Sequence, residues 1–152
     1  MTAMSATMAC GAVLAALLTA GSAAAALDQA RAEPNLEKRA KLALDNADAA
    51  LKAAREAYRA GNMAETNARL GELGDSVDLA FMSLSDTGKN PRKSPKYFKH
   101  AEMETRELTR KLDDFQHEMS YTDRPSIDKV KARIQQVHDD LLTGLMEGKK
   151  KK

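Results

Sequence analysis

The side chains best suited to metal chemistry in this sequence are three histidines, two of which have a methionine close by. Thioether and imidazole groups together suit copper. His100 and Met103 are three residues apart and would share one helix face, whereas His117 and Met119 are two apart and would diverge. The candidate metal ligands are therefore His100, Met103, His117, Met119 and His138.

A haem site can be considered with the same residue types. His138 and either Met63 or Met82 could supply the two axial ligands of a non-covalent haem across a helical bundle. However, methionines at helical spacing most often fill a core. Cys10 is the single cysteine and no Cys-x-x-Cys-His motif is present, so covalent haem is excluded. We predict no cofactor, and keep a copper- or haem-binding bundle as the alternative function.

Carboxylate pairs are the remaining candidates for catalysis. They occur at Asp113-Asp114 and at Asp139-Asp140. Adjacent residues of a helix point apart, so these pairs indicate solvated faces. The sequence contains neither Gly-x-Ser-x-Gly nor a Gly-rich phosphate loop. We therefore predict a protein that is not an enzyme and has no catalytic residues.

Positive charge is concentrated in two short blocks, although the net charge of the 152-residue chain is only +2. The first block has five Lys and Arg within eleven residues that contain no acid, and the second is the run of four lysines at 149–152. These nine leave 15 of the 24 Lys and Arg against 22 acidic residues, so the rest of the chain carries −7. The candidate anion contacts are Lys89, Arg92, Lys93, Lys96, Lys99, Lys149, Lys150, Lys151 and Lys152.

Four segments must position these residues. Apolar side chains recur at alternating spacings of three and four over about 34–60, 63–85, 95–119 and 126–145, which is typical of helices with one buried face. Four such helices favour an all-α, antiparallel four-helix bundle over residues 34–148, built from two long helical hairpins. The residues predicted to be buried include Leu44, Leu51, Leu73, Val77, Leu108, Phe115, Ile134 and Leu141.

The connections decide where the basic blocks lie. Those at 60–62 and 120–126 are short and force antiparallel hairpins, whereas the middle one, about 86–94, is longer. In up-down-up-down order the middle loop and both termini share one end, so the two blocks would form one basic pole near Arg31, Lys38 and Arg39. A middle connection that crossed over would instead separate them. Gly71 and Gly74 lie inside the second segment, where they predict either close approach to the first helix or a kink.

The first 26 residues are typical of a signal peptide. No charge precedes Asp28, and an apolar run at 11–20 is followed by small residues that permit cleavage after Ala25 or Ala26. Residues 27–33 would then form a short linker before the bundle. The alternative is an uncleaved N-terminal anchor, since the stretch from Met8 to Leu27 is long enough to span a bilayer.

A Tyr-x-x-Gly-Asn-x-x-Glu arrangement surrounds the first short connection, formed by Tyr58, Gly61, Asn62 and Glu65, with Ala54 before it and Leu70 after it. By these residues the segment 50–73 resembles a single tetratricopeptide-like helical hairpin. No second copy occurs, and repeat arrays need three or more units, so the resemblance implies a helical hairpin with a similar turn. The chain as a whole resembles uncharacterised exported all-helical proteins of bacteria, which implies a fold and a compartment but no activity.

These features predict a non-enzymatic, exported helical-bundle protein of the bacterial cell envelope, periplasmic or extracellular. Its basic pole would contact an anionic envelope component, a membrane surface or an acidic protein. Nucleic acid is disfavoured in an exported protein with a single stacking candidate, Tyr97, near the cations. The alternative interpretation of both basic blocks is a solvated loop and a solvated tail.

Overall fold

The computed structural model describes residues 21–148, and within them every regular element is an α-helix. The prediction of an all-α protein is therefore confirmed. Residues 1–20 of the predicted signal peptide and the basic tail 149–152 lie outside the described residues. The helices are α1 (Gly21–Ala32), α2 (Leu36–Arg59), α3 (Met63–Asp86), α4 (Lys96–Glu118) and α5 (Pro125–Glu147).

Helices α2 and α3 form an antiparallel hairpin with a three-residue connection. Gly61 adopts a φ of 78°, a left-handed conformation that glycine accepts without a steric penalty. The Asn62 side chain then caps α3 by accepting a hydrogen bond of 3.0 Å from the Glu65 N–H. Both residues act as turn and cap, as their types predict.

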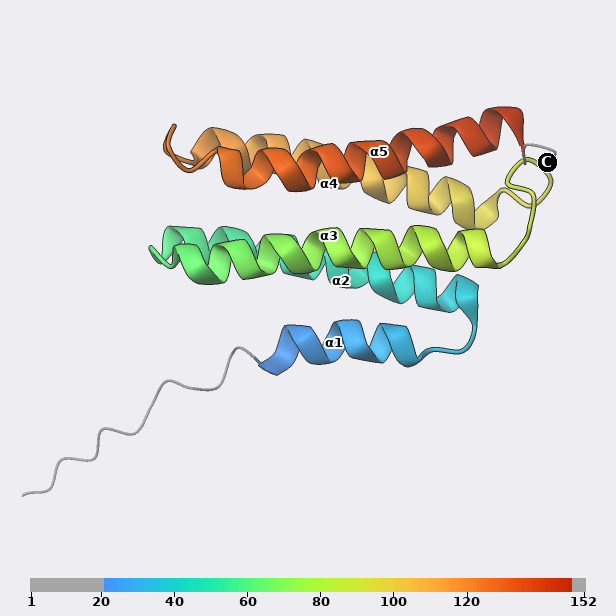
Figure 1. Cartoon of the computed structure of the whole chain (residues 1–152), viewed down its shortest axis with the longest axis horizontal. Helices are drawn as coiled ribbons and strands as arrows, with labels where there is room; N and C mark the ends of the chain where they lie inside the picture. The colour runs from blue at the N-terminus through green and yellow to red at the C-terminus, as the bar shows by residue number, and fades with distance from the viewer. Residues whose placement is uncertain (1–20, 149–152) are drawn as a thin grey trace, which may run out of the picture.

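Helices α4 and α5 form the second antiparallel hairpin, which lies against the first (Figure 1). Pro125 occupies the first position of α5, where its missing N–H costs no helical hydrogen bond. The core between the hairpins contains the side chains that the three-four spacing predicts, and Leu73, Phe115 and Ile134 are fully buried. On α2 the buried face is rich in alanine, which lets the backbones of α2 and α3 lie close together.

One end of the molecule is fixed by contacts between α2 and the connection from α4 to α5. The Tyr58 hydroxyl donates to Asp123 at 3.0 Å and accepts from the Ser120 N–H at 2.9 Å. Arg55 pairs with Glu118 and holds the pKa of that carboxyl below its usual range. The opposite end therefore carries the α1–α2 connection, the α3–α4 loop and the end of α5 (Figure 1). This is the arrangement expected of an up-down-up-down order.

Helix α1 replaces the linker that the sequence predicts at 27–33. Leu27 and Ala30 are buried, and α1 packs against α2 and α3. The reason is local: the stretch is rich in alanine, the strongest helix former, and places these two apolar side chains one turn apart on one face. Among residues 21–148, no helix is both long and apolar enough to cross a bilayer.

The two glycines of α3 neither kink the helix nor face α2. Helix α3 is continuous from Met63 to Asp86. A Cβ at Gly74 would lie 2.6 Å from Nη1 of Arg133 and 3.4 Å from Val130, so Gly74 allows close approach of α5. A Cβ at Gly71 would meet nothing within 4 Å. The expected approach to α2 is therefore wrong, because these positions point toward α5.

This difference predicts opposite results for two alanine substitutions. Gly71→Ala is expected to raise the free energy of unfolding by about 0.5–1 kcal/mol, because it removes backbone freedom from the unfolded chain without a clash. Gly74→Ala should give a smaller gain or a loss, since Arg133 must move away from Asp78. Urea unfolding followed by circular dichroism measures both. Equal stabilisation by the two variants would contradict the close packing at Gly74.

Candidate anion-binding site

The described part of the basic pole consists of Lys89, Arg92, Lys93, Lys96 and Lys99, on the α3–α4 loop and the first turn of α4. Asn90 organises the loop. Its side-chain oxygen accepts from the Arg92 N–H at 2.9 Å, and its carbonyl accepts from the Ser94 N–H at 2.9 Å. The Asn90-Pro91 dipeptide is a sequence signal for such a turn. The turn brings the cations of the loop beside those of α4.

Four of these five cations make neither an ion pair nor a hydrogen bond with the described residues 21–148. Most other Lys and Arg side chains of the described residues pair with a carboxylate, as Arg110 does with Glu107 and Arg133 with Asp78. Arg39 and Arg124 instead donate to backbone carbonyls. Within residues 21–148, the Lys and Arg side chains with neither an ion pair nor a hydrogen bond are Lys41, Arg92, Lys93, Lys96, Lys99 and Lys129.

The unpartnered cations of the pole are also exposed. Lys96 has one weak neighbour, the Tyr97 ring, whose centroid lies 5.3 Å from the ammonium. An exposed cation without a carboxylate partner keeps its full charge available to an external anion. Arg92, Lys93, Lys96 and Lys99 thus give the pole its free positive charge.

Lys89 behaves differently from the other predicted contacts, because its ammonium pairs with Glu37 in the first turn of α2. The same end contains Glu33, which is 3.1 Å from the Lys38 ammonium. The Asn35 N–H and then Lys38 hold the pKa of Glu33 below its usual range. These two acids are therefore engaged within the molecule, and Lys89 ties the α3–α4 loop to α2.

The second basic block, Lys149–Lys152, lies outside the described residues. The residue before it is Gly148, and a Cβ there would lie 3.1 Å from Oδ1 of Asn90 and 3.6 Å from Cβ of Arg92. The end of α5 therefore meets the loop that carries the first block. The last described residue of the chain thus lies beside the loop of the first block, while the predicted place of Lys149–Lys152 in the pole stays a prediction.

The candidate metal ligands differ in burial and in hydrogen-bond partner. His138 on α5 faces Glu102 at 2.9 Å, whereas His117 is exposed near the end of α4, with Nδ1 2.7 Å from the Asp113 carbonyl oxygen. Met119 is buried in the core and Met103 is exposed. His100 lies in the first half of α4, and its Nε2 is buried without a hydrogen-bond partner. Among residues 21–148, no group of three or more His, Cys, Asp or Glu side chains could hold a metal ion.

No protein-family model matches this sequence. No curated protein matches it significantly either.

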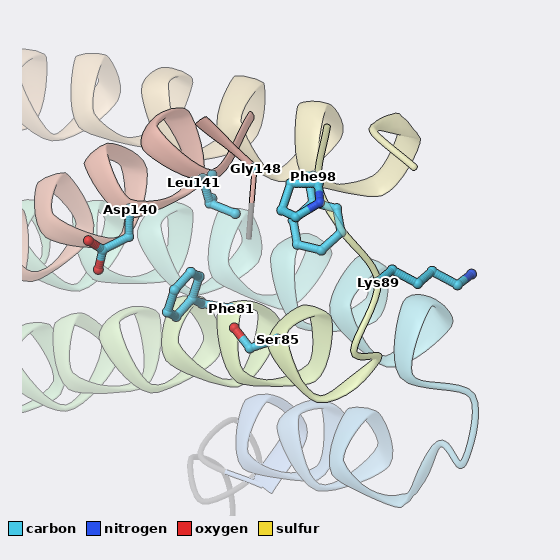
Figure 2. A pocket seen from close by; sticks show the side chains of 9 residues that line it. Phe81, Ser85, Lys89, Phe98, Asp140, Leu141 and Gly148 are labelled. Carbon is cyan, nitrogen blue, oxygen red and sulfur yellow. The ribbon is translucent and has the colours of Figure 1, made fainter. Parts of the chain in front are cut away.

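A crevice that the sequence did not predict lies beside the pole. Figure 2 shows its walls: Phe81 and Ser85 come from α3, Leu141 from α5 and Phe98 from α4. Pro91 of the loop completes the lining, and the volume is about 210 Å³. Only the packing of the two hairpins creates this space, so no local sequence signal could have revealed it.

Proposed function

We propose that this protein is a non-enzymatic interaction module of the bacterial cell envelope, and that its basic pole binds an anionic membrane surface. In this proposal the chain is exported by an N-terminal signal peptide, and α2–α5 serve as a rigid four-helix scaffold. The observation that carries the proposal is the exposed, unpartnered group Arg92, Lys93, Lys96 and Lys99 at one end of the molecule.

The physical basis is electrostatic attraction over a short range. A Lys or Arg close to an anionic bilayer contributes about 1 kcal/mol, and the effect decays within a Debye length of about 8 Å at physiological ionic strength. Cations must therefore be gathered on one surface to act together. An end of the bundle can be placed flat against a membrane, whereas charges spread along the helices cannot all reach it.

Two other function classes receive less support. Among residues 21–148 no group of three or more His, Cys, Asp or Glu side chains could hold a metal ion, and this gives a metal site less support. A nucleic-acid site needs exposed aromatic rings for stacking beside the cations. At the pole the available ring is that of Tyr97, which is half-buried and lies under Lys96. An anionic bilayer requires neither feature.

The proposal is tested by co-sedimentation of the full chain with vesicles. Vesicles with 30% anionic phospholipid and vesicles of neutral phospholipid are compared at low and high salt. We expect binding to the anionic vesicles that falls steeply as salt rises, because screening shortens the range of the pole's charge. Equal binding to both kinds of vesicle, or binding that salt leaves unchanged, would refute the proposal.

A further inference from the structure

The crevice beside the basic pole lies between α3 and α5. These helices are in close contact near Gly74 and enclose space nearer the pole. At Gly74 the backbone of α3 leaves no room for a Cβ beside Arg133. Further toward the pole, the two helices supply opposite walls of the crevice, Phe81 and Ser85 on α3 and Leu141 on α5 (Figure 2). The α3–α4 loop closes one end, where Pro91 packs against Gly144 and a Cβ on that glycine would be 3.2 Å away.

The walls are mainly hydrocarbon. Phe81, Phe98, Leu141 and Pro91 present carbon atoms, and the ammonium of Lys89, at the border of the crevice, pairs with Glu37. Ser85 brings a hydroxyl at the exposed edge, and Asp140 lies on the side away from Lys89 (Figure 2). An apolar group entering here would exchange water for carbon contacts, which is favourable in proportion to the area covered.

The size of the crevice restricts the occupant. Sites for drug-sized ligands and large cofactors usually exceed about 300 Å³, and this crevice has about 210 Å³. Water occupies about 30 Å³ per molecule in the liquid, and a methylene group is of similar size, so the space fits a chain of roughly seven carbons. This volume is too small for haem and suits a slender hydrocarbon chain.

The charge around the crevice selects the head group. Arg92 follows Pro91, and its Cβ lies beside Gly148, which also lines the crevice. Lys93 is the next residue of the same exposed turn, and within the described part of the chain neither side chain makes an ion pair or a hydrogen bond. The two cations thus lie on the loop that closes one end of the crevice, directly after the lining residue Pro91. An apolar slot with cations on its adjoining loop is complementary to an amphiphile with one anionic end. Asp140 lines the crevice on the side away from Lys89, and its negative charge disfavours a carboxylate at that side (Figure 2).

We infer that this crevice binds a free fatty acid anion, with its hydrocarbon chain between α3 and α5 and its carboxylate at Arg92 and Lys93. The inference deepens the proposed function, and it rests on that proposal for the anion-binding role of these two cations. The crevice itself, however, is independent of the membrane.

The chain-length dependence of binding tests the slot. Straight-chain carboxylates from hexanoate to dodecanoate are titrated by calorimetry into the full chain, below their critical micelle concentrations. Affinity should rise by up to about fourfold per added methylene and level off near eight carbons, when the slot is full. No binding, or a rise that continues to dodecanoate as in non-specific adsorption, would overturn the inference.

Two sets of variants locate the site. Ser85→Trp places a bulky side chain at the rim and is expected to weaken octanoate binding at least tenfold. Met82→Trp is the matched control, because Met82 is exposed on the same helix and does not line the crevice. Arg92→Gln with Lys93→Gln should weaken octanoate binding and leave octanol binding unchanged. If octanoate binds all these variants as it binds the unmodified chain, the assignment is wrong.

The vesicle experiment separates this inference from the proposed function. Octanoate binding that Ser85→Trp reduces, together with no binding to anionic vesicles, would support the crevice and refute the membrane role. Vesicle binding without octanoate binding would support the membrane role and refute the crevice as a binding site. A last experiment tests a membrane lipid as the occupant, with phosphatidylglycerol vesicles freed of fatty acid. Competition between these vesicles and octanoate would assign the slot to a membrane acyl chain and overturn free fatty acid as the occupant.

Discussion

Changing Arg92, Lys93, Lys96 and Lys99 together to glutamine is expected to weaken binding to anionic vesicles about a thousandfold. Each cation contributes about 1 kcal/mol at the membrane surface, and about 1.4 kcal/mol corresponds to a tenfold change in affinity. The fold should be unaffected, since none of these side chains has an ion pair or hydrogen bond to any residue of the described range 21–148. Vesicle titration followed by fluorescence of a labelled chain measures the change.

A second variant with the same loss of charge provides the control. Lys52, Arg59, Arg110 and Lys129 are exposed and lie on the helices away from the pole. Changing these four to glutamine lowers the net charge by the same amount. The comparison therefore separates the effect of where the positive charge lies from the effect of total charge. We expect a loss of affinity below tenfold. An equal loss in both variants would show that net charge, rather than the pole, determines binding.

The largest expected effect on stability is that of Phe115→Ala, which should lower the free energy of unfolding by about 3–5 kcal/mol. Phe115 on α4 is fully buried, and its ring meets that of Tyr58 on α2 edge to face, with centroids 5.8 Å apart. The substitution removes this contact and leaves a cavity between the two hairpins. Chemical denaturation of the variant and of the unmodified chain measures the difference.

Met103→Ala is the matched control for Phe115→Ala, because Met103 is on the same helix and its side chain is exposed. Its substitution should change the free energy of unfolding by less than about 0.5 kcal/mol. A loss below about 1 kcal/mol for Phe115→Ala would mean that the hairpins do not pack through this residue. A large loss for Met103→Ala would place an unrecognised contact on the outer face of α4.

The helical fold could be predicted because its main signal is local. Apolar residues recur every three or four positions, so Leu73, Phe115 and Ile134 could be assigned to buried faces without knowledge of the neighbours. Gly61 and Asn62 mark their turn for equally local reasons. Helix α1 was missed, because an alanine-rich stretch after an apolar run is typical of both a cleaved leader and a helix.

Interactions between helices could not be predicted in the same way. Asn46 on α2 donates to Ser76 at 2.9 Å and to Glu72 at 3.0 Å, both on α3. The partner of each polar residue depends on how two helices are rotated and shifted, which periodicity does not define. The pairing of Lys89 with Glu37 escaped prediction for the same reason.

The candidate site was predictable in part. The cations of the basic pole are dense in the sequence, and the short connections indicate which end of the bundle carries them. Which cations are free depends on the carboxylates within reach, and only the folded chain defines that. The crevice between Phe81 and Leu141 likewise depends on packing between hairpins.

Hydrogen–deuterium exchange of the full chain, with and without anionic vesicles, tests most directly whether the basic pole is the membrane contact. Bound membrane should slow exchange in the α3–α4 loop and the first turn of α4, over residues 88–99. The connections at 60–62 and 119–124, at the other end of the molecule, serve as the internal reference and should exchange unchanged. Protection at that other end, or protection nowhere despite binding, would contradict the account.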